Sequence, residues 1–147
     1  GCGRCIGACP VDAIQCRWDE AYEVLACKIA EYTKAVVDKR PCFHISLVCD
    51  VSPSCDCDSC NDLPIIPDVG MFASFDPVAL DQACVDAVNQ QSAARGSVLD
   101  EVLREQGLDE KKKEYFRTIH PDTRWEEGLA HAEKLGLGTR QYELIQL

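Results

Sequence analysis

The chain has 147 residues, 46% hydrophobic and 27% charged, a composition typical of a globular domain with its own core. Its formal net charge of -10 argues against a nucleic-acid partner and against an anionic membrane surface, because both need a basic face. The sequence has neither an apolar run long enough to cross a membrane nor a secretory leader, so we expect a cytoplasmic protein without a membrane partner.

The first half of the chain is expected to contain one helix and several extended segments. Residues 1–16 are rich in Gly and Cys and favour a loop. A helix should run from Asp19, its cap, to about Val37. Its apolar residues recur at helical spacing and form one stripe: Tyr22, Leu25, Ile29 and Val36. Strand-forming residues at 43–51 and 65–75 flank a polar loop that is dense in cysteine.

The second half is expected to be helical. Asp76 and Pro77 favour a helix that starts there and ends near Gln90, because Asp is a good N-cap and Pro suits the first helical position. A short helix should run from Ser97 to Gly107. The apolar positions expected to face inward on these two helices are Leu80, Ala83, Cys84, Ala87, Val88, Val98, Val102 and Leu103.

A last helix is expected to start at Asp122 and to be closed by Gly136. Residues 109–114 are charged and are expected to form a solvated face. Helices therefore dominate, with a few short strands between them, and the expected fold class is α+β.

Cysteine is the most informative residue type, with 11 copies. An odd number of thiols cannot all pair within one chain, and the cytoplasm disfavours disulfides. Cys2-x2-Cys5-x3-Cys9-Pro10 matches the last three cysteines and the proline of the bacterial ferredoxin motif Cys-x2-Cys-x2-Cys-x3-Cys-Pro. The spacing therefore predicts Cys2, Cys5 and Cys9 as ligands of a 4Fe-4S cluster, although the first pair alone would also suit zinc or free thiols.

The motif is incomplete as it stands. In two-cluster ferredoxins the cysteine before the proline ligates the other cluster, so Cys2 and Cys5 would serve one cluster and Cys9 another. We therefore expect a longer natural protein and an absent or incomplete cluster in this piece. Cys16 or Cys27 could substitute, but neither lies at a diagnostic spacing. The expected organisation is a partial ferredoxin-type segment over residues 1–17 and a C-terminal α+β domain over residues 18–147.

A second group of cysteines, Cys55-x-Cys57-x2-Cys60, lies in the polar loop. Three thiols within six residues could hold zinc or iron, with Cys49 or His44 as a fourth ligand. This spacing is not a standard zinc pattern, and the alternative is that the loop cysteines bind nothing. The isolated Cys84 is expected to be a core residue.

Catalytic motifs are absent from the sequence. It has no glycine-rich phosphate loop, and its three histidines, His44, His120 and His131, have no evident nucleophile beside them. Asp68, Asp76 and Asp81 could converge on a cation, but Asp76 is already expected to cap a helix.

Together these segments resemble the C-terminal part of prokaryotic iron–sulfur centre proteins, which belong to a large family of domains of unknown function. The matching stretches are Cys2 to Ile14, Trp18 with the helix after it, Val51 to Cys57, Pro64 to Ser74, Asp76 to Ala83 and Ala132 to Ile145. The resemblance implies a further N-terminal domain, a first ferredoxin motif and cluster binding by Cys2, Cys5 and Cys9. It implies no defined reaction and gives no role to Cys42, Cys49, Cys60 or Cys84.

We therefore expect an iron–sulfur module that transfers electrons or responds to redox conditions. The acidic surface would suit docking to a basic redox partner protein. Two alternatives stay open: a zinc-stabilised structural or interaction domain built on Cys55, Cys57 and Cys60, and a subdomain of a larger iron–sulfur enzyme.

Overall fold

The computed structural model describes residues 4–15, 21–55, 58–59, 61–107 and 114–147, with only the backbone described for Cys5. Several expectations lie outside these residues, namely those for Cys2, Cys16, Asp19, Cys57, Cys60 and most of the charged run at 109–114. Within the described residues, no helix is long and apolar enough to cross a membrane.

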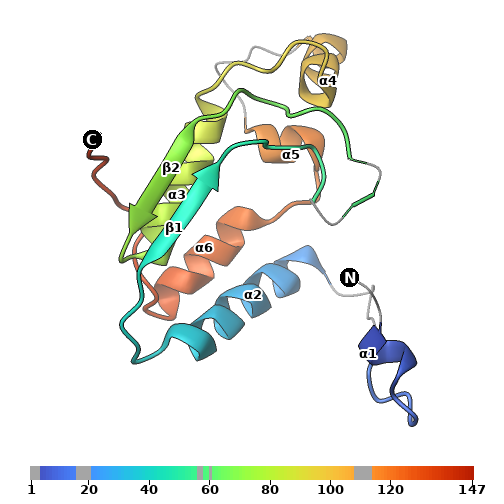
Figure 1. Cartoon of the computed structure of the whole chain (residues 1–147), viewed down its shortest axis with the longest axis vertical. Coiled ribbons are helices and arrows are strands. Elements are labelled where there is room, and N and C mark those ends of the chain that lie inside the picture. The colour runs from blue at the N-terminus through green and yellow to red at the C-terminus, as the bar shows by residue number, and fades with distance from the viewer. Residues whose placement is uncertain (1–3, 16–20, 56–57, 60, 108–113) are drawn as a thin grey trace.

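Helices dominate the fold, and the described residues contain one two-stranded antiparallel sheet, which confirms the α+β class. The elements in chain order are α1 (Arg4–Gly7), α2 (Tyr22–Val37), β1 (His44–Val48), β2 (Gly70–Ser74), α3 (Pro77–Asn89), α4 (Val98–Gln106), α5 (Tyr115–Ile119) and α6 (Trp125–Lys134). Figure 1 shows α1 to one side, away from the sheet.

The sheet has two faces of different character. β1 and β2 pair from His44 opposite Ser74 to Val48 opposite Gly70, so alternate residues point to opposite sides. Helix α3 packs behind the strands in Figure 1. The other face is open and apolar, and the large side chains exposed on it are Phe43, Ile45, Leu47, Met71 and Phe75. The rings of Phe43 and Phe75 contact each other there, with centroids 4.9 Å apart.

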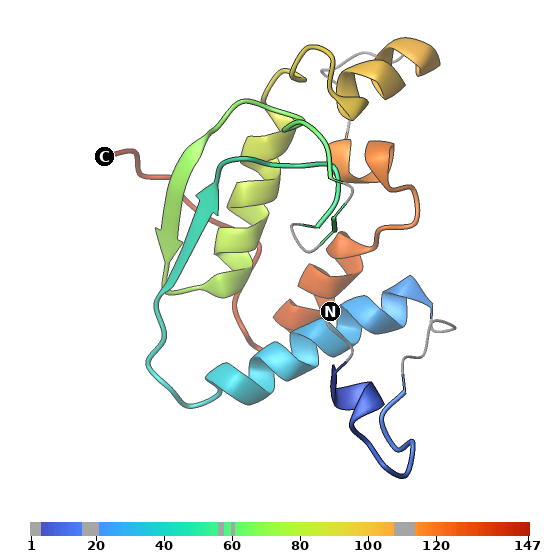
Figure 2. The ribbon, with the colours of Figure 1, turned by 45° about the vertical axis from the view of Figure 1, so that its right-hand side comes forward.

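Helices α2 and α6 lie side by side in Figures 1 and 2. They approach closely because the residues between them are small: a Cβ placed on Gly128 would lie 3.4 Å from the Cβ of Ala26. Ala30 and Ala132 are buried in the same contact, together with Val78 of α3.

The expected apolar stripe of α2 does not face this contact. Tyr22, Leu25, Ile29 and Val36 are all exposed, with 52% to 63% of their surfaces open. Tyr32 extends the same stripe and is 74% exposed. Periodicity identified one side of the helix correctly as apolar, but the helix packs against α6 through its adjacent alanines.

The main core lies at the end of the sheet where Val48 pairs with Gly70. It is formed by residues from β1, the segment before β2, α3, α4 and α5: Val48, Ile65, Ile66, Val88, Leu99, Leu103 and Tyr115. Tyr115 is completely buried, and its hydroxyl donates to the carbonyl oxygen of Gln91 at 2.7 Å. These contacts attach the second half of the chain to the sheet.

The capping residues confirm most of the expected helix boundaries. The Asp76 carboxylate accepts from the N–H groups of Val78 and Ala79, and Ser97 Oγ accepts from Asp100 N. Gly107 ends α4 in the left-handed conformation, with φ of 59°. Three details differ from the expectation: α2 begins at Tyr22 with Ala21 rather than Asp19 as its N-cap, α6 begins at Trp125 rather than at Asp122, and α5 was not anticipated.

Candidate functional site

The segment that carries the ferredoxin-type spacing begins with a single helical turn, where the sequence favoured a loop. The Ala8 N–H donates to the carbonyl oxygen of Arg4, and the Cys9 N–H donates to that of Ile6. Cys5 therefore lies within α1, and Cys9 lies two residues beyond its end at Gly7. The chain then reverses at Asp12, whose φ of 50° is in the left-handed region that Asp tolerates better than most residues.

This reversal brings backbone N–H groups back to the sulfur of Cys9. The N–H of Ala13 donates to Cys9 Sγ at 3.3 Å. Hydrogen bonds from the backbone of Val11, Ala13 and Ile14 lower the pKa of the Cys9 thiol, because donors aimed at the sulfur favour its anionic form. The surroundings of the half-buried Cys9 thus favour the thiolate, the form that ligates metals, more than bulk water would.

The expected ligand set lies only partly within the described residues. Cys2 and the side chain of Cys5 lie outside the description, so no distance joins them to Cys9. Cys27, considered as a substitute ligand, is half-buried on α2. The hydrogen-bond donors around Cys9 fit a thiolate ligand.

The second cysteine loop is organised by an amide side chain. Asn61 Oδ1 accepts from Ser54 N at 3.1 Å, and Asn61 Nδ2 donates to Ser52 Oγ at 2.9 Å and to the carbonyl oxygen of Ser54 at 3.0 Å. His120 Nε2 lies 2.6 Å from the carbonyl oxygen of Pro53 and ties the loop to the end of α5. Cys55 is exposed on this loop, whereas Cys57 and Cys60 lie outside the described residues.

No metal-binding group of three or more His, Cys, Asp or Glu side chains forms within the part of the chain that the structure describes. The three aspartates that could have converged have separate partners. Asp68 Oδ1 accepts from Asp50 N at 2.9 Å, Asp76 caps α3, and Asp81 faces a cavity. Their proximity in sequence therefore does not produce a cation site.

The lone cysteine of α3 behaves as expected for a core residue. Cys84 is half-buried and hydrogen bonded to Ser46 of β1, and desolvation by burial raises the pKa of its thiol. One turn earlier, Asp81 lies close enough to His44 to interact electrostatically. Sequence reasoning missed Asp81 as a cavity residue, because the cavity is formed by helices that are distant in sequence.

Comparison with known families identifies one match. Residues 4–86 match the family described as Domain of unknown function (DUF362). This stretch includes Cys5 and Cys9, the second cysteine loop and the first part of α3. No curated protein and no solved structure matches the chain significantly. Since the match covers more than half of its residues, the chain belongs to the DUF362 family.

Proposed function

We propose that this chain is an iron–sulfur module that transfers electrons or links its state to redox conditions. Cys2, Cys5 and Cys9 are the ligands in this proposal, and the cluster would supply the one-electron chemistry. The observation that carries it is the N–H of Ala13 donating to the sulfur of Cys9, within a Cys-x2-Cys-x3-Cys-Pro motif.

The contacts around Cys9 support this role. Donors directed at a ligand sulfur stabilise its negative charge, and such hydrogen bonds are among the factors that set the reduction potential of a cluster. The Ala13 N–H is a donor of this kind, and the backbone of Val11 and Ile14 lowers the pKa of the Cys9 thiol in the same direction. A cysteine that only packs in a core does not need hydrogen-bond donors directed at its sulfur.

The charge of the chain suggests the kind of partner. With a net charge of -10, the protein would associate fastest with a basic redox partner, because opposite charges steer the encounter. The proposal places both proteins in the cytoplasm, where the thiols stay reduced.

The test is anaerobic reconstitution of the chain with iron and sulfide, followed by metal and acid-labile sulfide analysis and an absorption spectrum. Wild type should acquire iron and acid-labile sulfide at less than one full cluster per chain, as expected for an incomplete motif, together with a broad visible band. Cys9→Ser should lose most of both, because a hydroxyl is a poor ligand for iron in such clusters. Cys84→Ala is the matched control and should load like wild type, since Cys84 is hydrogen bonded to Ser46 in the fold.

The opposite results would contradict the proposal. Equal loading of wild type and Cys9→Ser would mean that the motif does not hold the cluster. Zinc bound without sulfide, and lost on substitution of Cys55, Cys57 and Cys60, would instead support a structural zinc domain.

A further inference from the structure

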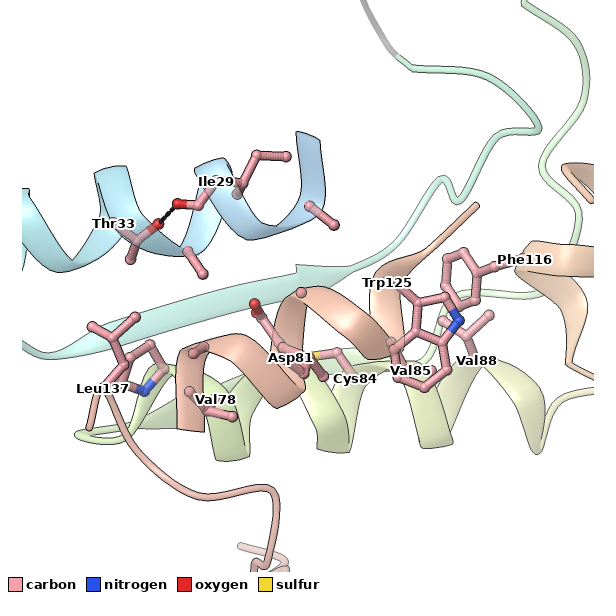
Figure 3. Close-up of a pocket in the computed structure, with 16 residues that line it drawn as sticks. Ile29, Thr33, Val78, Asp81, Cys84, Val85, Val88, Phe116, Trp125 and Leu137 are labelled. Carbon is pink, nitrogen blue, oxygen red and sulfur yellow. Dashed lines mark hydrogen bonds between the residues drawn. The ribbon is translucent and has the colours of Figure 1, made fainter. Parts of the chain in front are cut away.

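A cavity of about 370 Å³ lies between α2, α3 and α6. Figure 3 shows its walls: Ile29 and Thr33 come from α2, Val78, Asp81 and Val85 from α3, and Trp125 from α6. The volume falls within the range of small-molecule sites, which are usually concave, largely apolar and formed before the ligand arrives.

Small residues create this space. Ala26 and Ala30 of α2 face Gly128 and Ala132 of α6, and these small residues leave room beside α3, where Ala30 and Ala132 pack with Val78. The remaining wall is built from apolar groups of α3 together with Phe116 and Leu137. Water in such a space leaves apolar surface hydrated, so an apolar ligand that displaced the water would stabilise the fold.

One charged side chain lines the cavity. Among the described residues that form its wall, only Asp81 carries a formal charge, and Figure 3 shows its carboxylate directed toward the space beneath α2. Asp81 is exposed to solvent on one side, and partial desolvation by the protein on the other raises the pKa of its carboxyl. His44 of β1 interacts with this carboxylate electrostatically, and Cys84 lies one turn further along α3.

We propose that this cavity binds a small amphipathic cation, that is, an apolar ring or short chain bearing a protonated amine that pairs with Asp81. The apolar walls favour the ring, and a carboxylate in partly desolvated surroundings attracts a cation and repels an anion more strongly than it would in bulk water. The proposal is independent of cluster binding, because it uses none of the motif cysteines.

The test compares ligands that differ only in their charged end. Phenethylamine and hydrocinnamate share a phenyl ring and a two-carbon chain, but one is a cation and the other an anion. Calorimetric titrations at about pH 8 keep the amine protonated. Phenethylamine should bind at least tenfold more tightly than hydrocinnamate. Phenethyl alcohol, which is neutral, should fall between them.

Two Asp→Asn substitutions then test which carboxylate pairs with the amine. Asp81→Asn should reduce phenethylamine affinity at least tenfold and remove its advantage over hydrocinnamate. Asp86→Asn is the control: this carboxylate lies on the same helix but accepts from Gln82 Nε2 and Tyr142 Oη, outside the cavity wall. It should leave both affinities within twofold of wild type.

A third variant tests the space itself. Thr33→Leu adds apolar volume at the wall and should weaken all three ligands together. The proposal is overturned if phenethylamine does not bind, if it binds no better than hydrocinnamate, or if Asp86→Asn costs as much affinity as Asp81→Asn. Tighter binding of phenethyl alcohol than of the amine would identify a purely apolar site and would also overturn it.

Discussion

Asp76 joins the first turn of α3 to Thr139 in the C-terminal tail. One carboxylate oxygen of Asp76 accepts from the N–H groups of Val78 and Ala79, at 2.9 and 3.0 Å. The other accepts from the N–H of Thr139 at 2.9 Å, across 63 residues of sequence. A single side chain thus caps a helix and holds the segment that follows α6.

Removal of this carboxylate should destabilise the protein. We expect Asp76→Ala to lower the free energy of unfolding by about 1–2 kcal/mol, because the cap and the link to Thr139 are lost together. Urea denaturation followed by circular dichroism would measure the change. Asp38→Ala, which breaks only the surface pair with Lys34, should cost less than about 1 kcal/mol. Equal losses would mean that Asp76 is no more than a surface charge.

The same contact makes Gly138 intolerant of a side chain. A Cβ at this position would lie 1.9 Å from Asp76 Oδ1, whose position is fixed by hydrogen bonds. Gly138→Ala should therefore lower the melting temperature and increase hydrogen exchange at Thr139. Gly7→Ala is a suitable control, because nothing lies within 4 Å of the added atom. An unchanged exchange rate at Thr139 would show that the tail is held by other contacts.

The core around Tyr115 should be sensitive to lost volume. Leu99 has no exposed surface, and Leu99→Ala should cost about 2–5 kcal/mol in the free energy of unfolding, from lost burial and from the space left behind. Leu63 is 59% exposed, and Leu63→Ala should change stability by no more than about 0.5 kcal/mol. Chemical denaturation of both variants would compare the two sites directly, and similar costs would contradict the position of Leu99 in the core.

Asp100 should contribute stability that depends on pH. Its hydrogen bond with Arg104, together with one from the Gly96 N–H, lowers the pKa of its carboxyl from 3.8 to about 2. Because the folded-state pKa is the lower one, the stabilisation is complete above the unfolded pKa of 3.8 and disappears as pH falls to about 2.

Thermal unfolding of wild type and Asp100→Asn would measure this dependence. Wild type should melt at the higher temperature near neutral pH, and the two curves should converge in acid. Asp62→Asn serves as the control, since Asp62 accepts only from the N–H of the adjacent Leu63 and has no basic partner in the described contacts. A difference between wild type and Asp100→Asn that persists at pH of about 2 would contradict the assignment.

The open face of the sheet should promote aggregation. Leu47 and Met71 are 66% and 68% exposed and lie opposite each other on the paired strands. Substitution of both by Thr should reduce light scattering at high protein concentration without lowering stability, because neither residue belongs to the core. Leu144→Thr in the tail is the control and should have little effect. Unchanged scattering in the double variant would show that this face does not drive association.

Local signals explain which parts of the fold were predictable. Asp76 with Pro77, and Ser97 with Gly107, act on backbone groups within four residues, so the ends of α3 and α4 followed from the sequence. The orientation of α2 did not follow from the sequence, because periodicity identifies the apolar side of a helix but not the element that packs against it. α5 has only five residues, too few for a periodic pattern.

The candidate sites divide in the same way. The cysteine motif is contiguous, so its chemistry was visible in the sequence, and the contact from Ala13 to Cys9 is also local. The cavity depends on Ala26, Asp81 and Gly128, which come from three helices and have no common pattern. Only the packing of α2, α3 and α6 brings them together.

The pairing of β1 with β2 also determines how this region can tolerate insertions. Extra residues in the turn between Val37 and His44 would leave both strands unchanged. One extra residue within β1 would reverse the faces of the residues on one side of it: after Ile45, for example, it would place Ser46 in water and Leu47 against α3. Length variation among relatives should therefore occur in the turn, while the strand keeps a constant number of residues.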